Sequence, residues 1–341
     1  GCTGVDSVVV RIYDVGISLT GLDSEYCITS PDVTMYGSPF GTFSGDGVTG
    51  DVFSPGAAGV GVHYIKFKSQ KSFIRTETIF EDDFSTTSKG WTGIGAGGWY
   101  IGQVAVYNNC DAGYDNPTTD HTGDGYILGT YLGTCYENNM SLPYYLASPF
   151  INCSGYRSIK VQFYSHSAFE AGDTATFEVF DGTSWNIVYS NITTPINENT
   201  WTKKEFSVSS YADNNPFFKM RFRIGRTNSS IVEKGWKIDD FKLIGIKSFI
   251  CYDSIIKKVE VKDVPSIDIG PDISLCNGDS ATLSVASGFS YRWSTGDTTA
   301  MIKIGPPATT QYDVTVWNNV CTSHDSIMVF VANKPNVSLG N

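Results

Sequence analysis

The sequence predicts an all-β protein, and three observations support this fold class. Short runs of alternating apolar and polar residues recur along the chain, for example at 158–163 and 175–180. No long stretch shows the period near 3.6 that is typical of amphipathic helices. Glycine and proline are abundant, with 35 and 13 of 341 residues, as expected of strands joined by turns. A chain of this length can hold two or three domains, each with its own core.

The net charge of −11 and the pI near 4.8 disfavour nucleic acid and anionic membranes as partners, but are compatible with divalent cations. We therefore expect no nucleic-acid binding and no direct membrane insertion. The eight cysteines include no C-x-x-C pair, which disfavours a zinc site. Their places in the repeats described next favour disulfides and an oxidising, extracellular setting.

A pattern repeats three times, beginning at Cys2, Cys251 and Cys321. Each copy has a cysteine, then Asp-Ser, then a strand and a short link into a new strand, as where one domain runs into the next. A second pattern, with a cysteine in an early strand, occurs around Cys27 and Cys276. A unit therefore runs from an early-strand cysteine to a cysteine before its last strand.

These repeats predict five segments. Residues 264–333 form a complete immunoglobulin-like unit with Trp293 in its core. A second such unit, 15–77 plus 247–263, is interrupted by a separate sandwich at 78–246, an insertion that is tolerated when the inserted ends lie close together. We expect residues 1–14 to be the last strand of a preceding domain and 334–341 the first strand of a following one.

The same unit definition predicts two disulfides, Cys276–Cys321 and Cys27–Cys251, each closing one immunoglobulin-like unit. Within the insert, Cys110 and Cys135 flank a glycine-rich loop, so a bond between them would pin that loop and leave Cys153 as a buried thiol. Pairing of Cys153 with Cys110 is the alternative.

The motif Gly-Thr-Phe-Ser-Gly-x-Gly-Val at 41–48 and Tyr-x-Val-Thr-Val at 312–316 resemble the tandem immunoglobulin-like modules of giant Bacteroidota adhesins, of the gliding and type IX-secreted kind. The resemblance covers about half of the chain. It implies a cell-surface protein, attached to the outer membrane through other parts, with the secretion or motility machinery as a partner of the full-length protein.

The insert carries short motifs in a characteristic order: Asp-Asp-Phe-Ser at 82–85, Gly-Trp at 90–91, the segments 117–126 and 146–149, and Gly-Trp-Lys-Ile-Asp-Asp-Phe at 235–241. In this order they resemble the MAM-type jelly roll and the related cleaved-adhesin modules of secreted bacterial proteases and haemagglutinins. The resemblance implies an inserted jelly-roll sandwich.

In a jelly roll the first and last strands pair, which would bring Asp83 and Asp240 together, and Asp120 from a central loop would complete a shell of oxygen ligands. Such a shell suits a structural calcium ion, and the resemblance implies the same site, with Asp82 as the alternative to Asp83. The competing interpretation is that each aspartate caps a turn.

No catalytic motif is present, and the four histidines (His63, His121, His166 and His324) have no partner at metal-ligand spacing, so we expect no enzyme. His121 alone adjoins a loop aspartate, and a structural role is favoured for it too. Candidate ligand-binding aromatics are Trp99, Tyr100, Tyr107 and Tyr114, since aromatic faces stack on sugars and on proteins. We assign the other large rings of the insert, such as Trp91, Trp236 and Phe241, to its core.

A further pattern, Asp followed by Ser or Thr and a small or apolar residue, resembles the O-glycosylation signal of Bacteroidota secreted proteins. Its acceptor residues would be Ser7, Thr174, Ser254, Ser280, Thr298 and Ser326. Ordinary strand-edge composition, repeated because the domain repeats, is the alternative.

Together these features predict a segment of a large adhesin, in which an immunoglobulin-like stalk presents a calcium-stabilised sandwich to surfaces, glycans or glycoproteins. The alternatives are an ancillary targeting region of a secreted hydrolase and a structural subunit of an extracellular filament.

Overall fold

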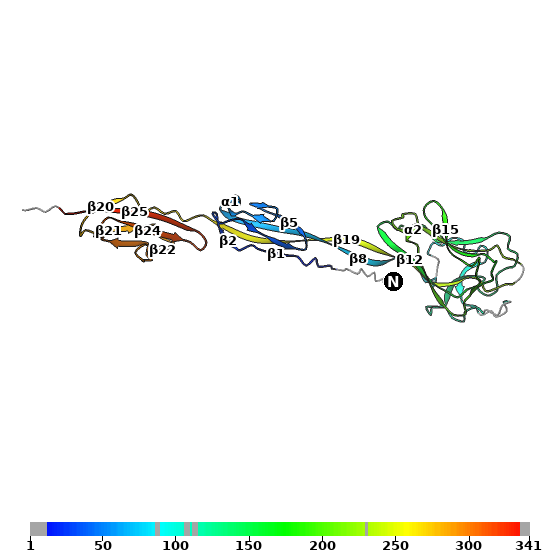
Figure 1. Cartoon of the computed structure of the whole chain (residues 1–341). Helices are drawn as coiled ribbons and strands as arrows, with labels where there is room; N and C mark the ends of the chain where they lie inside the picture. The colour runs from blue at the N-terminus through cyan, green and yellow to red at the C-terminus, as the bar shows by residue number, and fades with distance from the viewer. Residues whose placement is uncertain (1–11, 86–88, 106–109, 111–114, 229–230, 335–341) are drawn as a thin grey trace, which may run out of the picture. The chain divides into compact units, whose positions relative to one another are not determined.

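The computed structural model describes residues 12–85, 89–105, 110, 115–228 and 231–334. In these residues the only helices are the one-turn α1 (Pro55–Ala58) and α2 (Ser209–Ala212), and the regular structure is otherwise β-strand (Figure 1). The prediction of an all-β protein is confirmed. No helix of the described part is long and apolar enough to cross a membrane. The chain divides into two compact units, Ser72–Phe249 and a discontinuous unit of Gly1–Lys71 with Ile250–Asn341.

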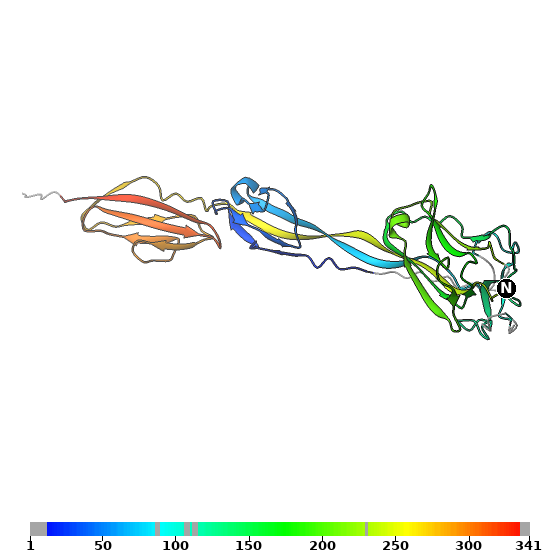
Figure 2. The ribbon, with the colours of Figure 1, turned by 45° about the vertical axis from the view of Figure 1, so that its right-hand side comes forward.

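Two long strands belong to both units. Strands β8 (Gly61–Asp82) and β19 (Lys237–Lys262) pair with each other and lie side by side in Figures 1 and 2. The first part of β8 and the last part of β19 belong to the discontinuous unit, and the rest of both strands belongs to the unit Ser72–Phe249. This unit is therefore inserted in the chain between the two segments of the discontinuous unit.

The unit Ser72–Phe249 is a sandwich of two antiparallel sheets. The first has the order β17-β12-β19-β10-β9, and the second the order β11-β18-β14-β15. Its further strands are β9 (Trp99–Gln103), β10 (Tyr126–Thr130), β11 (Tyr144–Ala147), β12 (Tyr156–Ser165), β13 (Ala168–Phe169), β14 (Ala175–Phe180), β15 (Trp185–Ser190), β16 (Ile196–Asn197), β17 (Thr202–Ser207) and β18 (Lys219–Ile224).

Alternation of side chains builds the core of this sandwich. On β18, Met220, Phe222 and Ile224 are fully buried, whereas the residues between them point to the other face. Phe222 meets Phe163 of the opposite sheet with 5.2 Å between ring centroids, in an edge-to-face contact. The expectation that Trp91, Trp236 and Phe241 belong to the core is confirmed, because all three are buried within it.

The discontinuous unit contains two further cores. The first is built from β1 (Ser18–Thr20), β2 (Glu25–Cys27), β3 (Val33–Thr34), β4 (Tyr36–Ser38), β5 (Gly41–Ser44), β6 (Val48–Thr49) and β7 (Val52–Phe53), with parts of β8 and β19. Phe53, Ile65 and Val259 lie at its centre and are fully buried. Strand β2, near the start of this domain, pairs in parallel with the end of β19, its last strand.

The second core belongs to β20 (Ile273–Cys276), β21 (Ala281–Ser284), β22 (Ser290–Trp293), β23 (Met301–Ile304), β24 (Thr310–Trp317) and β25 (Thr322–Ala332). The sheet β20-β25-β24-β22 packs on the pair β21-β23. Trp293 is buried as expected, and its indole N–H donates to the Thr299 carbonyl at 2.8 Å.

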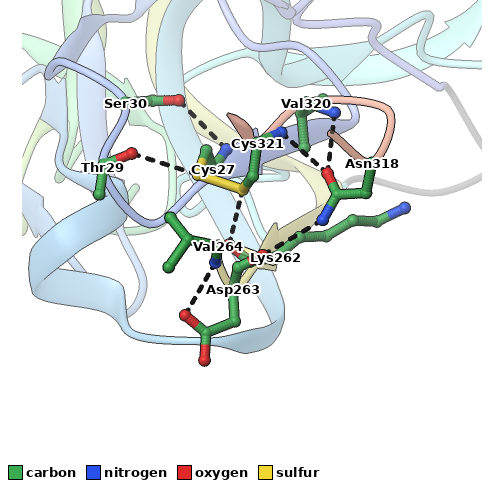
Figure 3. The surroundings of a disulfide bond; sticks show 9 residues. All are labelled: Cys27, Thr29, Ser30, Lys262, Asp263, Val264, Asn318, Val320 and Cys321. Atoms are coloured by element: carbon green, nitrogen blue, oxygen red, sulfur yellow. Dashed lines mark hydrogen bonds between the residues drawn. A yellow bond between two sulfur atoms is a disulfide. The ribbon is translucent and has the colours of Figure 1, made fainter. Parts of the chain in front are cut away.

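The disulfides differ in part from the prediction. Cys110–Cys135 is formed, with Cys153 as a buried thiol, and this prediction is confirmed. Cys27, however, bonds Cys321 (Figure 3), so the predicted Cys27–Cys251 and Cys276–Cys321 bonds are wrong.

Strand register explains the error. Cys27 pairs with Lys262, whereas Cys251 lies eleven positions earlier (251 against 262) on the same strand, roughly 36 Å away at about 3.3 Å per residue. Cys276 pairs with Ala332, and Cys321 is again eleven positions earlier (321 against 332). A disulfide requires Cα atoms within about 7 Å, so neither predicted pair can close.

Candidate binding face and acidic loop cluster

Asp82, at the end of β8, is a buried structural carboxylate. Its two oxygens accept hydrogen bonds from the backbone N–H groups of Phe84 (3.0 Å) and Lys89 (3.1 Å) and from the indole N–H of Trp91 (3.1 Å). Burial raises the pKa of this carboxyl above its ordinary value. These bonds fix the loop after β8 and orient Trp91, so the turn-capping interpretation describes Asp82.

Asp83 and Asp120 also hold turns. Asp83 accepts from the N–H and hydroxyl of Ser85, and these hydrogen bonds lower its pKa. One oxygen of Asp120 accepts from the N–H groups of Gly123 at 2.6 Å and Asp124 at 2.7 Å. Burial acts to raise the pKa of Asp120, but the surrounding backbone N–H groups outweigh it and the pKa falls. In both residues the hydrogen bonds described here engage a single oxygen.

The centre of the cluster is Asp239, which is not among the predicted ligands. It is fully buried, and its carboxylate accepts from the N–H of His121 (2.9 Å) and the N–H of Asp240 (2.8 Å). Asp240 adopts a positive φ of 51° and places its own carboxylate 2.5 Å from Nδ1 of His121. The His121 ring stacks on Tyr164, with 3.5 Å between centroids. These contacts clip the loop around residue 121 onto the start of β19.

These hydrogen bonds place the aspartates around the loop at 120–124 and the start of β19. Among the described residues, no group of three or more His, Cys, Asp or Glu side chains is placed to hold a metal ion. Three of the predicted ligands, Asp82, Asp83 and Asp240, do line one small hollow. Its other lining residues are Glu81, Lys89, Thr122, Phe241 and Lys242. Calcium binding stays a prediction from the sequence.

The predicted ligand-binding aromatics are only partly at the surface. Trp99 is fully buried and lies 6.3 Å from the Phe222 ring, so its assignment as a ligand contact is wrong. The reason is strand alternation: Trp99 points into the core and Tyr100, 44% exposed, points out. Tyr107 and Tyr114 lie outside the described residues.

A different aromatic surface lies on the outside of the sheet β11-β18-β14-β15. The register aligns Ala147, Arg221, Glu178 and Ile187 across the four strands, and Lys219, Phe180 and Trp185 across three of them. We define this aromatic face by its rings and cations: Tyr145, Phe150, Phe180, Trp185, Lys219 and Arg221.

Arg221 is the fixed centre of the aromatic face. Its guanidinium lies between two rings, 4.3 Å from the centroid of Tyr145 and 3.9 Å from that of Trp185. Beneath it, the carboxylate of Glu178 accepts its N–H groups at 2.5 and 2.7 Å, and this carboxylate side chain is only 5% exposed. A buried counter-ion and two flanking rings hold the arginine in one orientation.

The aromatic face continues past Trp185. Phe180 contacts Trp185 at 5.5 Å, and Phe150 contacts Phe180 at 6.4 Å. Lys219 lies 4.9 Å over the Phe150 ring, which is 62% exposed. The alternation of 219–224, with cations at every outward position, is the signal that reveals this face in the sequence, although the register of four strands distant in sequence is needed to assemble it.

Other predicted sites have the following positions. Of the glycosylation candidates, Ser254, Ser280, Thr298 and Ser326 are exposed, Thr174 is half-buried and Ser7 lies outside the described residues. Their modification stays a prediction.

The buried Asp239 makes a testable contribution to pH dependence. Burial raises the pKa of Asp239 to about 6, above the ordinary value of 3.8, so the folded state binds the carboxyl proton more tightly than the unfolded state does. The contribution of protonated Asp239 to the free energy of unfolding is therefore complete below pH 4 and is lost as pH rises through 6. Relative to the Asp239→Asn variant, the wild type should lose about 2 to 3 kcal/mol of unfolding free energy between pH 4 and 7.

Asp83→Asn is the control. The pKa of Asp83 is lowered, so the difference in unfolding free energy between wild type and Asp83→Asn, measured in urea melts, should change with pH in the opposite direction. Parallel curves for the wild type and the Asp239→Asn variant would contradict the assignment.

The calcium prediction is tested by thermal melts of the whole chain with calcium and with EDTA. The sequence predicts a higher melting temperature with calcium, and loss of that difference in Asp120→Asn. Asp213→Asn serves as the reference, because Asp213 also accepts backbone N–H groups, from Ser158 and Ile159, but is not a candidate ligand, so its loss should destabilise the sandwich equally in both conditions. A melting temperature that does not change with calcium would contradict the calcium prediction. The hydrogen bonds of Asp120 and Asp239 would then be sufficient to hold the loop at 120–124.

No protein-family model and no curated protein matches the chain. Among solved structures it is similar to the K3 cleaved adhesin domain of Lys-gingipain from Porphyromonas gingivalis W83, at 12% identity over 50% of this chain and 99% of that chain, with a TM-score of 0.29. The CBM22-1–GH10 modules of Clostridium thermocellum xylanase 10B match at 13% identity over 49% of this chain and 28% of theirs, with a TM-score of 0.30. The N-terminal four Ig domains of Dscam1 isoform 6.9 match at 12% identity over 92% of this chain and 99% of theirs, with a TM-score of 0.20. The structural neighbours thus include bacterial cleaved-adhesin and immunoglobulin-like domains, but likenesses at these TM-scores carry no functional argument.

Proposed function

We propose that this chain is an adhesive segment of a secreted or cell-surface protein, and that its sandwich binds glycans through the aromatic face. Two disulfides are typical of proteins that fold in an oxidising compartment. The observation that carries the proposal is the Arg221 guanidinium held between Tyr145 and Trp185 on an outward sheet surface.

The chemistry of this surface suits a sugar. Pyranose rings present apolar C–H faces that stack on aromatic side chains, and their hydroxyl groups accept hydrogen bonds from cations. Phe150, Trp185 and Tyr145 provide rings along one sheet, and Lys219 and Arg221 provide donors between them. Because Glu178 already fixes Arg221, little side-chain entropy is lost when a ligand binds.

The finer parts of the assignment are also proposals. They comprise a MAM-like or cleaved-adhesin-like identity for the sandwich, export by a type IX route, a role in gliding motility, attachment at the outer membrane and the absence of enzymatic activity. A targeting region of a secreted hydrolase would use the same face to hold a substrate. A filament subunit would instead cover it with a neighbouring chain.

Binding is tested on a glycan array, followed by titration of the strongest glycan with the whole chain. Trp185→Ala should weaken binding about tenfold or more, since buried or stacked aromatic and arginine contacts dominate interface energies. Tyr100→Ala is the matched control, an exposed ring on the other sheet, and it should bind as the wild type does. Both variants should retain the wild-type melting temperature within a few degrees.

Three results would contradict the proposal. The first is a Trp185→Ala variant that binds like the wild type, and the second is loss of binding in Tyr100→Ala instead. The third is a blank array combined with adhesion to cells that survives enzymatic removal of their glycans, which would assign the face to a protein partner.

A further inference from the structure

The two immunoglobulin-like parts present the same site at the end of their last strand. In the first, Cys27 of β2 pairs in parallel with Lys262, at the end of β19. In the second, Cys276 of β20 pairs in parallel with Ala332, at the end of β25. Cys27 and Cys276 therefore occupy equivalent positions, and so do Lys262 and Ala332.

The turn that follows each cysteine is also the same. The N–H of Ile28 donates to the Lys262 carbonyl at 2.9 Å, and the N–H of Asn277 donates to the Ala332 carbonyl at 2.9 Å. Within the same turn, Ser30 N–H donates to the Cys27 carbonyl and Asp279 N–H to the Cys276 carbonyl, both at 2.9 Å. The equivalence thus extends over the backbone that would receive a neighbouring domain.

The bond to Cys27 comes from the hairpin between β24 and β25. The Asn318 side chain folds this tip: its oxygen accepts the N–H of Cys321 at 2.8 Å, and its amide donates to the Asp263 carbonyl at 3.2 Å (Figure 3). The Cys321 sulfur lies 3.3 Å from the Lys262 carbonyl oxygen. The hairpin of one domain therefore holds both the linker and the early-strand cysteine of the domain before it.

Exposure distinguishes the two otherwise equivalent sites. Cys27 is 3% exposed because the hairpin covers it, whereas Cys276 is an exposed thiol. The sequence after the second site also repeats that after the first: Lys334-Pro335 follows Ala332 as Val264-Pro265 follows Lys262. The second site therefore has the cysteine, the turn and the linker proline of the first at the same spacing, without its hairpin.

We propose that Cys276 is the receiving half of a second disulfide staple, and that its partner is the hairpin-tip cysteine of a further module of this type following in the same chain. The bond forms by two-electron oxidation of the two thiols, with the electrons passing to the disulfide pool of the oxidising compartment. Cys251 is the donor position of the first domain, since it lies eleven residues before Lys262 as Cys321 lies eleven before Ala332. The staples would then link each domain to the next along the array.

The experiment extends the whole chain by a second copy of residues 265–334 placed directly after Lys334. The extended protein is equilibrated in glutathione redox buffers, alkylated and mapped by mass spectrometry. We expect a new bond between Cys276 and the second-copy Cys321, with Cys251 still alkylated. The effective thiol concentration of this new disulfide should lie within about tenfold of that of Cys27–Cys321, which is measured in the same sample as an internal reference.

Two variants of the second copy sharpen the result. Second-copy Cys321→Ser should leave Cys276 alkylated, and second-copy Asn318→Ala should lower the effective concentration several-fold, because the contact with the linker peptide is lost. The proposal is overturned if Cys276 stays alkylated in the extended chain while Cys27–Cys321 is intact. It is equally overturned if Cys276 bonds Cys251 of another molecule, or if the Asn318→Ala copy bonds as strongly as the parent.

Discussion

The packing of Phe222 against its neighbours is the interaction on which the sandwich depends. Its ring lies within 5.3 Å of the rings of Phe163 in β12, Phe177 in β14 and Trp236, the residue just before β19. Because strand residues alternate, fixing Phe222 in the core also fixes Arg221 on the outside of the same strand. The aromatic face is thus the outer surface of the sheet whose inner surface forms the core. The acidic cluster depends on the same packing, because β19 places Asp239 between the sheet and the loop around His121.

Much of this architecture could be predicted from local pattern. Period-two alternation and frequent turns were sufficient to predict the all-β class. Trp91, Trp236 and Trp293 could be assigned to the cores, since a large aromatic ring is strongly stabilised by burial. The Cys110–Cys135 bond was predictable as well, because both cysteines flank one loop and little chain separates them.

Features that depend on pairing between distant strands could not be predicted. The repeat shows which cysteines occupy equivalent positions. It does not show whether an early-strand cysteine bonds the later cysteine of its own domain or the equivalent cysteine of the next domain, so Cys27 was assigned the wrong partner. The contacts of Arg221 with Tyr145, Glu178 and Trp185 could be predicted only if the register of all four strands were known. Asp239 and Asp240 are adjacent and chemically identical in the sequence; only the fold buries the first and leaves the second to meet His121.

In the function proposed above, the sandwich recognises its ligand through the aromatic face, not through the loop cluster around Asp239. Hydrogen–deuterium exchange of the whole chain, with and without the best-binding glycan from the array, tests this directly. Protection on binding should be confined to peptides covering 144–150, 176–187 and 219–223. Protection confined to peptides covering 115–124 and 199–204 would contradict it and would place recognition at the loop cluster.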